Sequence, residues 1–87
     1  MVSIVKNSGE SINDAIIILG ATGSTDGVAV EYEYLEEKFG KRGLGWKLNR
    51  QSLLSINNKY YDEMDLTLSD GTQIVLYFDI TDFFGKF

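Results

Sequence analysis

The chain has 87 residues, a formal net charge of −5, and neither histidine nor cysteine. Histidine is the commonest acid/base group and metal ligand near neutral pH, and cysteine supplies thiolate nucleophiles and disulfides. Their absence argues against zinc, copper and haem sites, Ser-His or Cys-His catalysis, and disulfide cross-links. We therefore expect no cofactor, no metal and no enzymatic activity. The acidic balance also argues against a nucleic acid partner, which usually meets a basic face.

The length leaves room for a single small domain over residues 1–87. A hydrophobic content of 44% is typical of a folded protein. The longest apolar run, residues 15–19, is too short to cross a bilayer, and no signal-peptide-like segment stands near the start. We expect a cytoplasmic protein without membrane association, which the lack of cysteine fits.

The N-terminal half predicts one buried strand and one helix. Residues 1–14 indicate either an extra edge strand or a flexible arm. Residues 15–19 are apolar and rich in isoleucine, which favours a buried strand. A helix is predicted over residues 25–39, with one apolar stripe of Val28, Tyr32, Leu35 and Phe39. Four glutamates are expected on its solvent side: Glu31, Glu33, Glu36 and Glu37.

The C-terminal half alternates between apolar and polar residues with a period of two, which predicts an antiparallel meander. Its strands are expected over residues 46–56, 59–68 and 72–80, with turns at 57–58 and 69–71. Within the first strand, Arg50 is expected on the inward face with Trp46, where Asp62 of the next strand is its natural partner. Residues 81–87 form an aromatic tail whose phenylalanines should bury against the core.

These elements predict an α+β fold, a two-layer β-α-β-β-β sandwich with one helix on a mainly antiparallel four-stranded sheet. The order resembles the cystatin-like architecture, in which a curved antiparallel sheet wraps a single helix. The resemblance concerns topology alone, because the Gln-x-Val-x-Gly signature of cystatins is missing. Protease inhibition is therefore not implied.

The sheet face turned away from the helix is the main candidate for function. Six residues should point outward there: Tyr61, Glu63, Asp65, Val75, Tyr77 and Asp79. Tyrosines with an acidic rim suit docking of a basic protein partner or a second copy of the chain. Alternatively, the tyrosines and the valine only stabilise the sheet through cross-strand packing. We predict a small acidic, non-catalytic protein-interaction module, such as an inhibitor, an immunity-type protein or an adaptor.

A second hypothesis is binding of phosphate, a nucleotide or nucleic acid. The segment 38–50 contains five basic and no acidic residues, whereas the remainder has three basic and thirteen acidic residues, a net −10. Its candidate anion-binding residues are Lys41, Arg42, Lys47 and Arg50. The loop 20–27, with Gly20, Gly23 and Gly27, resembles the phosphate loop of short-chain dehydrogenases. However, Asp26 stands at the third glycine position, and a meander follows instead of further βαβ units, so we favour an ordinary strand-to-helix turn.

Overall fold

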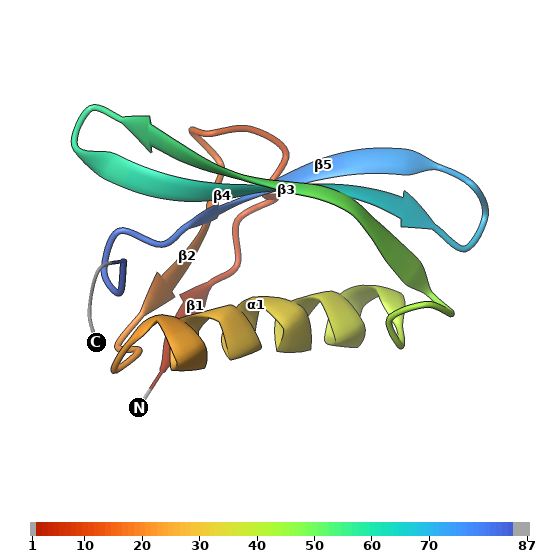
Figure 1. The fold of residues 1–87 in the computed structure, drawn as a ribbon, viewed down its shortest axis with the longest axis horizontal. Coiled ribbons are helices and arrows are strands. Elements are labelled where there is room, and N and C mark those ends of the chain that lie inside the picture. Colours follow the sequence, from red (N-terminus) through yellow and green to blue (C-terminus); the bar gives the residue numbers. More distant parts are fainter. Residues whose placement is uncertain (1, 85–87) are drawn as a thin grey trace.

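The structure is a computed structural model that describes residues 2–84 of the chain. Its elements are β1 (Ser3–Val5), β2 (Ile16–Leu19), α1 (Ser24–Phe39), β3 (Trp46–Ile56), β4 (Lys59–Leu68) and β5 (Gln73–Asp79). The strands form one sheet in the order β1-β2-β5-β4-β3. The helix lies along one side of this sheet (Figure 1). The predicted α+β class, with one helix packed on a sheet, is confirmed.

The sheet differs from the prediction in its strand number and direction. It has five strands rather than four, because Ser3–Val5 pairs antiparallel with β2 as an edge strand. It is mixed rather than mainly antiparallel at that side, because β2 and β5 run parallel. Their ladder joins only Ile16 to Phe78 and Ile17 to Asp79. A ladder of two residue pairs between segments so far apart in the sequence leaves no local sequence pattern. The cystatin-like topology is not confirmed.

The meander of β3, β4 and β5 forms as predicted, and its turns follow from local chemistry. Asn57 and Asn58 have φ values of 51° and 66°, a conformation that asparagine tolerates better than most residues. They close a two-residue hairpin between Ile56 and Lys59. Gly71, with φ of 87°, allows the turn from β4 to β5. The sheet is thereby fixed in one register from residue 50 onward.

A bulge in β3 changes which side chains face the helix. Leu48 lies opposite Leu66, but Arg50 lies opposite Asp65, so Asn49 is an extra residue in the ladder. Because side chains alternate with a period of two, one extra residue reverses the orientation of the rest of the strand. Arg50 therefore lies on the outer face, and its predicted inward position was wrong.

The helix packs on the sheet with a face rotated from the predicted stripe, of which Leu35 lies in the core and Tyr32 and Phe39 pack against it. Glu31, Tyr34 and Leu35 are fully or almost fully buried, whereas Val28, Tyr32 and Phe39 are only partly buried. Glu31 was expected in solvent, and this prediction was wrong. Phe83 packs against Gly27, which lies one turn before Glu31 on the same side of the helix. A side chain at Gly27 would overlap the Phe83 ring.

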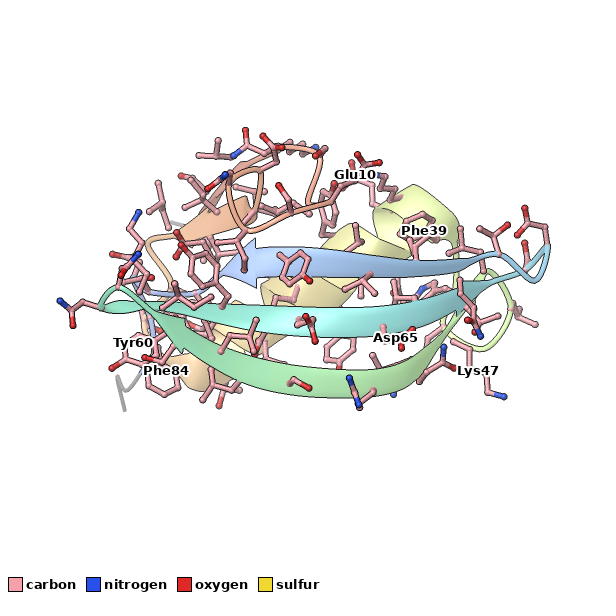
Figure 2. All side chains as sticks on the ribbon, turned by 90° about the horizontal axis from the view of Figure 1, so that it is seen from above. Glu10, Phe39, Lys47, Tyr60, Asp65 and Phe84 are labelled. Atoms are coloured by element: carbon pink, nitrogen blue, oxygen red, sulfur yellow. The ribbon has the colours of Figure 1, made fainter. Side chains whose placement is uncertain are left out.

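The aromatic tail and the helix end close the core at its two ends. Phe83 is buried, and Phe84 stacks on Tyr60 with ring centroids 4.2 Å apart (Figure 2). Residues 85–87, including the third phenylalanine of the tail, lie outside the described residues. At the other end the Trp46 indole N–H donates to the Gly40 carbonyl over 2.8 Å. Strand β3 is thereby tied to the helix C-terminus.

Candidate interaction surface

The six residues predicted to face away from the helix lie on three cross-strand pairs of β4 and β5. Tyr61 lies opposite Asp79, Glu63 opposite Tyr77, and Asp65 opposite Val75. Directly opposed residues of an antiparallel pair project to the same side of a sheet. The structure therefore brings all six to one face, here called the outer face.

One end of the outer face is covered, contrary to the expectation that the whole face is exposed. Tyr61 is 6% exposed and Asp79 is 9% exposed. The segment between β1 and β2 rises on the side of the sheet away from α1 (Figure 1). Asn7 and Ile12 of this segment line, together with Tyr61 and Asp79, a shallow pocket of about 170 Å³. Tyr61 is therefore part of the packed protein rather than of a free surface.

The rest of that face is open, and we call Glu63, Asp65, Val75 and Tyr77 the open outer face. Val75 is exposed, and the other three are partly buried. The Tyr77 hydroxyl donates a 2.8 Å hydrogen bond to the Glu63 carboxylate. This bond raises the pKa of Tyr77, because ionisation would remove the donor and place two negative charges together. An aromatic ring is thus held in a defined orientation beside an exposed valine.

Strand β3 adds basic and amide groups to this face, which the sequence analysis did not place there. The Asn49 side-chain amide donates to the Thr67 hydroxyl over 2.8 Å and to Asp65 over 3.4 Å. Arg50 lies opposite Asp65 because of the bulge. Figure 2 shows Lys47 and Asp65 on neighbouring strands toward the same end of the sheet. The open outer face is therefore bordered by basic groups of β3, so the charge around it is mixed instead of uniformly acidic.

The free edge of β3 is a further feature that the sequence analysis missed. Among residues 2–84 no strand pairs with the far side of β3, which is the outermost strand of the sheet (Figure 2). Leu53 is 54% exposed and Ile56 is 39% exposed, with Leu54 partly buried between them. We call residues 51–56 the β3 edge. An uncharged six-residue run without proline or glycine could have indicated such an edge from the sequence.

The four candidate anion-binding residues do not form one site. All four side chains are exposed. Arg42 lies over the rings of Tyr32 and Trp46, at 5.2 and 5.7 Å from their centroids. Lys47 and Arg50, by contrast, belong to β3, and Arg50 projects to the outer face. Lys41 and Arg42 follow the helix in the connecting loop, so the basic groups are divided between different parts of the surface.

The glycine-rich loop lies at the other end of the helix from these basic residues. The sixteen residues of α1 separate Gly23, just before the helix, from the loop with Lys41 and Arg42 by roughly 24 Å. Within the loop, the Gly20 N–H donates to Asp82 over 2.8 Å, and the Thr22 hydroxyl contacts the Asp26 carboxylate. Two carboxylates therefore lie where a phosphate group would bind. The structure does not bring the loop and the basic segment together.

A pair of carboxyl groups is enclosed between α1 and β4. Glu31 is fully buried and Asp62 is 6% exposed. Neither carboxylate oxygen of Glu31 has a hydrogen-bond partner among residues 2–84. Burial, and after it the Asp62 carboxyl group, raises the pKa of Glu31 to about 10. The predicted Arg50 partner of Asp62 lies on the opposite face of the sheet, so the pair contains two acids and no base.

No further assignment comes from metal-ligand geometry or from likeness to other proteins. Residues 2–84 hold no group of three or more acidic, histidine or cysteine side chains arranged to bind a metal ion. In the same residues no helix combines the length and apolarity needed to cross a membrane. No family model, curated protein or solved structure matches the chain.

Proposed function

We propose that this chain is a small acidic, non-catalytic protein-interaction module. Its contact surface consists of the open outer face and the β3 edge. An inhibitor, an immunity-type protein or an adaptor would each use such a surface. A cytoplasmic location and the absence of a cofactor belong to the same proposal.

The observation that carries the proposal is the β3 edge. An unpaired strand presents backbone N–H and C=O groups that can pair with another chain, and proteins usually protect such edges with charges, proline or a covering segment. The β3 edge contains no charged residue and no proline, and it exposes Leu53 and Ile56. Burial of such side chains by a partner removes apolar area from water.

The open outer face supports the same function from the adjoining surface. Tyrosine is enriched at binding hot spots, and Tyr77 is fixed by its hydrogen bond to Glu63. The mixed charges of Arg50, Glu63 and Asp65 would orient an approaching protein rather than hold it. The enclosed position of Glu31 supports a non-catalytic function, because a catalytic acid must reach its substrate.

The proposal is tested by capture of protein partners with matched variants. The tagged protein is incubated with native lysate from its source, and retained proteins are quantified by mass spectrometry and light scattering. A retained protein, or a second copy of this chain, should bind in a fixed ratio. Binding should be lost on Leu53→Lys or on the double change Val75→Ser and Tyr77→Ser. Leu44→Ser is the control, since Leu44 is exposed in the loop after the helix.

Two results would count against the proposal. One is the absence of any protein bound in a fixed ratio, including a second copy. The other is equal binding by all three variants, which would place the contact elsewhere. Recovery of nucleotides or nucleic acid alone, with loss on Arg42→Ala, would instead support the ligand-binding hypothesis.

A further inference from the structure

The direction of the backbone groups along β3 follows from the hydrogen-bonded ladders of the sheet. The Leu68 N–H bonds to the Thr72 carbonyl, so the even-numbered residues of β4 direct their backbone groups toward β5. The odd-numbered residues of β4 therefore face β3. Their partners there include Arg50, Ser52 and Leu54. The remaining residues, Gln51, Leu53 and Ser55, direct their N–H and C=O groups away from the sheet.

These three outward residues are symmetric about Leu53. If two β3 strands run antiparallel with Leu53 opposite Leu53, Gln51 of each copy lies opposite Ser55 of the other. Each outward N–H then meets an outward C=O across the junction, since these positions are the hydrogen-bonded pairs of an antiparallel ladder. A shift of the register by two residues leaves one outward residue of each strand unmatched. The edge is therefore complementary to itself in one register.

The side chains allow the same register. On the outer face it places Ser52 opposite Leu54 and Arg50 opposite Ile56, and on the other face it brings the two copies of Leu53 together. No pair opposes two charges of one sign, which would otherwise weaken a cross-strand contact. The exposed side chain of Leu53 would contact its copy in this arrangement, and that of Ile56 would lie beside Arg50. A partner of strong charge would gain nothing from this uncharged run.

Both ends of the β3 edge limit the pairing to these residues. The bulge at Asn49 breaks the regular ladder before Gln51. The Asn57-Asn58 turn reverses the chain after Ile56. Strand β1 and the free side of β5 have fewer unpaired backbone groups for such pairing. Strand β1 has only three residues, and the edge of β5 is occupied by Ile17 and by the Gly9 carbonyl, which accepts from the Tyr77 N–H over 2.8 Å.

We propose that two copies of this chain associate by antiparallel pairing of their β3 strands about a twofold axis at Leu53, so that two five-stranded sheets become one. This inference rests on the proposed function and names the partner as a second copy. A twofold contact in which the same patch is used by both subunits is the commonest form of homodimer. Because strand pairing buries a small area, below about 1,200 Å², the dimer should be in exchange with the monomer.

The test uses charge at the twofold axis. The wild type is examined by sedimentation equilibrium over a range of concentrations up to the hundreds of micromolar expected for weak contacts. Leu53→Lys and Leu53→Glu are each examined alone and then mixed in equal amounts. Leu44→Lys is the matched control for added charge. Leu53 is already more than half exposed, so these variants should fold, which circular dichroism verifies.

The proposal predicts a concentration-dependent dimer for the wild type and for Leu44→Lys. Each Leu53 variant alone should be monomeric because like charges meet at the axis, and the mixture should form a one-to-one dimer because opposite charges meet. This rescue requires that the two copies of residue 53 lie close to each other across the junction. A hydrogen-exchange experiment should show added protection at Gln51, Leu53 and Ser55 in the dimer.

Three outcomes overturn the inference: a wild type that stays monomeric, a dimer that persists in both Leu53 variants, and a mixture that stays monomeric. None of them by itself removes the proposed function. A monomeric chain that still captures another protein through Val75 and Tyr77 would keep the interaction module and reject the second copy as its partner. A monomeric chain that captures nothing would reject both.

Discussion

Two neighbouring carboxylates of β4 have opposite environments. Asp62 faces the helix, where it is 6% exposed and adjoins the fully buried Glu31. Glu63, the next residue, lies on the outer face and accepts a hydrogen bond from Tyr77. The alternation of a strand is sufficient to separate them. The helix side of the sheet therefore holds a buried acidic pair, whereas the outer side holds a partly exposed carboxylate with a hydrogen-bond donor.

This contrast shows that the group which lowers the folding stability lies on the helix side of the sheet. An enclosed carboxyl group without a hydrogen-bond partner has to be protonated or solvated, and either requirement costs free energy. A partly exposed carboxylate that accepts one hydrogen bond changes the free energy of unfolding only slightly. Mutations and pH changes on the helix side should thus alter the free energy of unfolding strongly. Mutations on the open outer face should mainly alter the affinity for the proposed partner.

The largest expected loss lies on the helix side, at Trp46. Its ring is buried, stacks on Tyr32 with centroids 6.1 Å apart, and donates to the Gly40 carbonyl. Trp46→Ala should lower the free energy of unfolding by about 3–5 kcal/mol, as large aromatic truncations do. Trp46→Phe, which keeps a ring and loses the hydrogen bond, should cost clearly less. Urea denaturation followed by circular dichroism measures both, and equal losses would show that ring burial is not the main contribution.

Glu31→Gln should stabilise the protein at neutral pH. In the folded state the pKa of Glu31 is about 10, against an ordinary value of 4.5. The folded protein therefore keeps a proton that the unfolded chain releases, so this group lowers the stability progressively as the pH rises from 4.5 toward 10. At pH 7 the variant Glu31→Gln should therefore have a free energy of unfolding higher than that of the wild type by on the order of 3 kcal/mol.

The measurement is the difference in unfolding free energy between Glu31→Gln and the wild type at several pH values. The difference should be near zero at pH 4 and should grow with pH up to about 10. Glu33→Gln, an exposed neighbour on the same helix, should show no such growth. If the curves for Glu31→Gln and the wild type ran parallel, Glu31 would be solvated in the folded protein.

The sequence predicted the meander well because its determinants are local. The period-two alternation and the Asn57-Asn58 turn define β3 and β4 within a few residues of chain. The bulge at Asn49 is a single extra residue without a distinctive side chain, so the strand was assigned one continuous face. The β2–β5 pairing joins residues 16–17 to residues 78–79, and no pattern within either strand indicates it.

The candidate surface was predicted only in part for the same reason. The alternation correctly placed Tyr61, Glu63 and Tyr77 on one face. It carried no information on the segment before β2, whose path over Tyr61 depends on long-range contacts such as the Tyr77 N–H donating to the Gly9 carbonyl. Glu31 was missed because a glutamate in a helix usually lies in solvent. The need for glycine at position 27 could not be predicted either, because it comes from the ring of Phe83, which is distant in the sequence.

The two tyrosines of the outer face provide the next comparison. Tyr61 is buried beneath the segment before β2, so Tyr61→Ser should cost on the order of 2–3 kcal/mol of unfolding free energy. Tyr77 is on the open outer face, and Tyr77→Ser should cost less than about 1 kcal/mol. Thermal unfolding of the two variants checks the order. Equal costs would show that the outer face is either covered or open along its whole length.

The smallest expected effect concerns the hydrogen bond between Tyr77 and Glu63. Glu63→Gln should leave the free energy of unfolding almost unchanged, because a surface interaction of this kind contributes a few tenths of a kcal/mol. It should nevertheless lower the pKa of Tyr77 toward its ordinary value of 10.0, since the Glu63 hydrogen bond is the main cause of the raised value. Nuclear magnetic resonance of labelled tyrosine rings follows this titration site by site.

Asp65→Asn is the control, because Asp65 lies opposite Val75 and its replacement should leave the titration of Tyr77 unchanged. An unchanged Tyr77 titration in Glu63→Gln would mean that the ring is not oriented by this carboxylate, and the proposed binding role of Tyr77 would lose the fixed ring orientation that supports it.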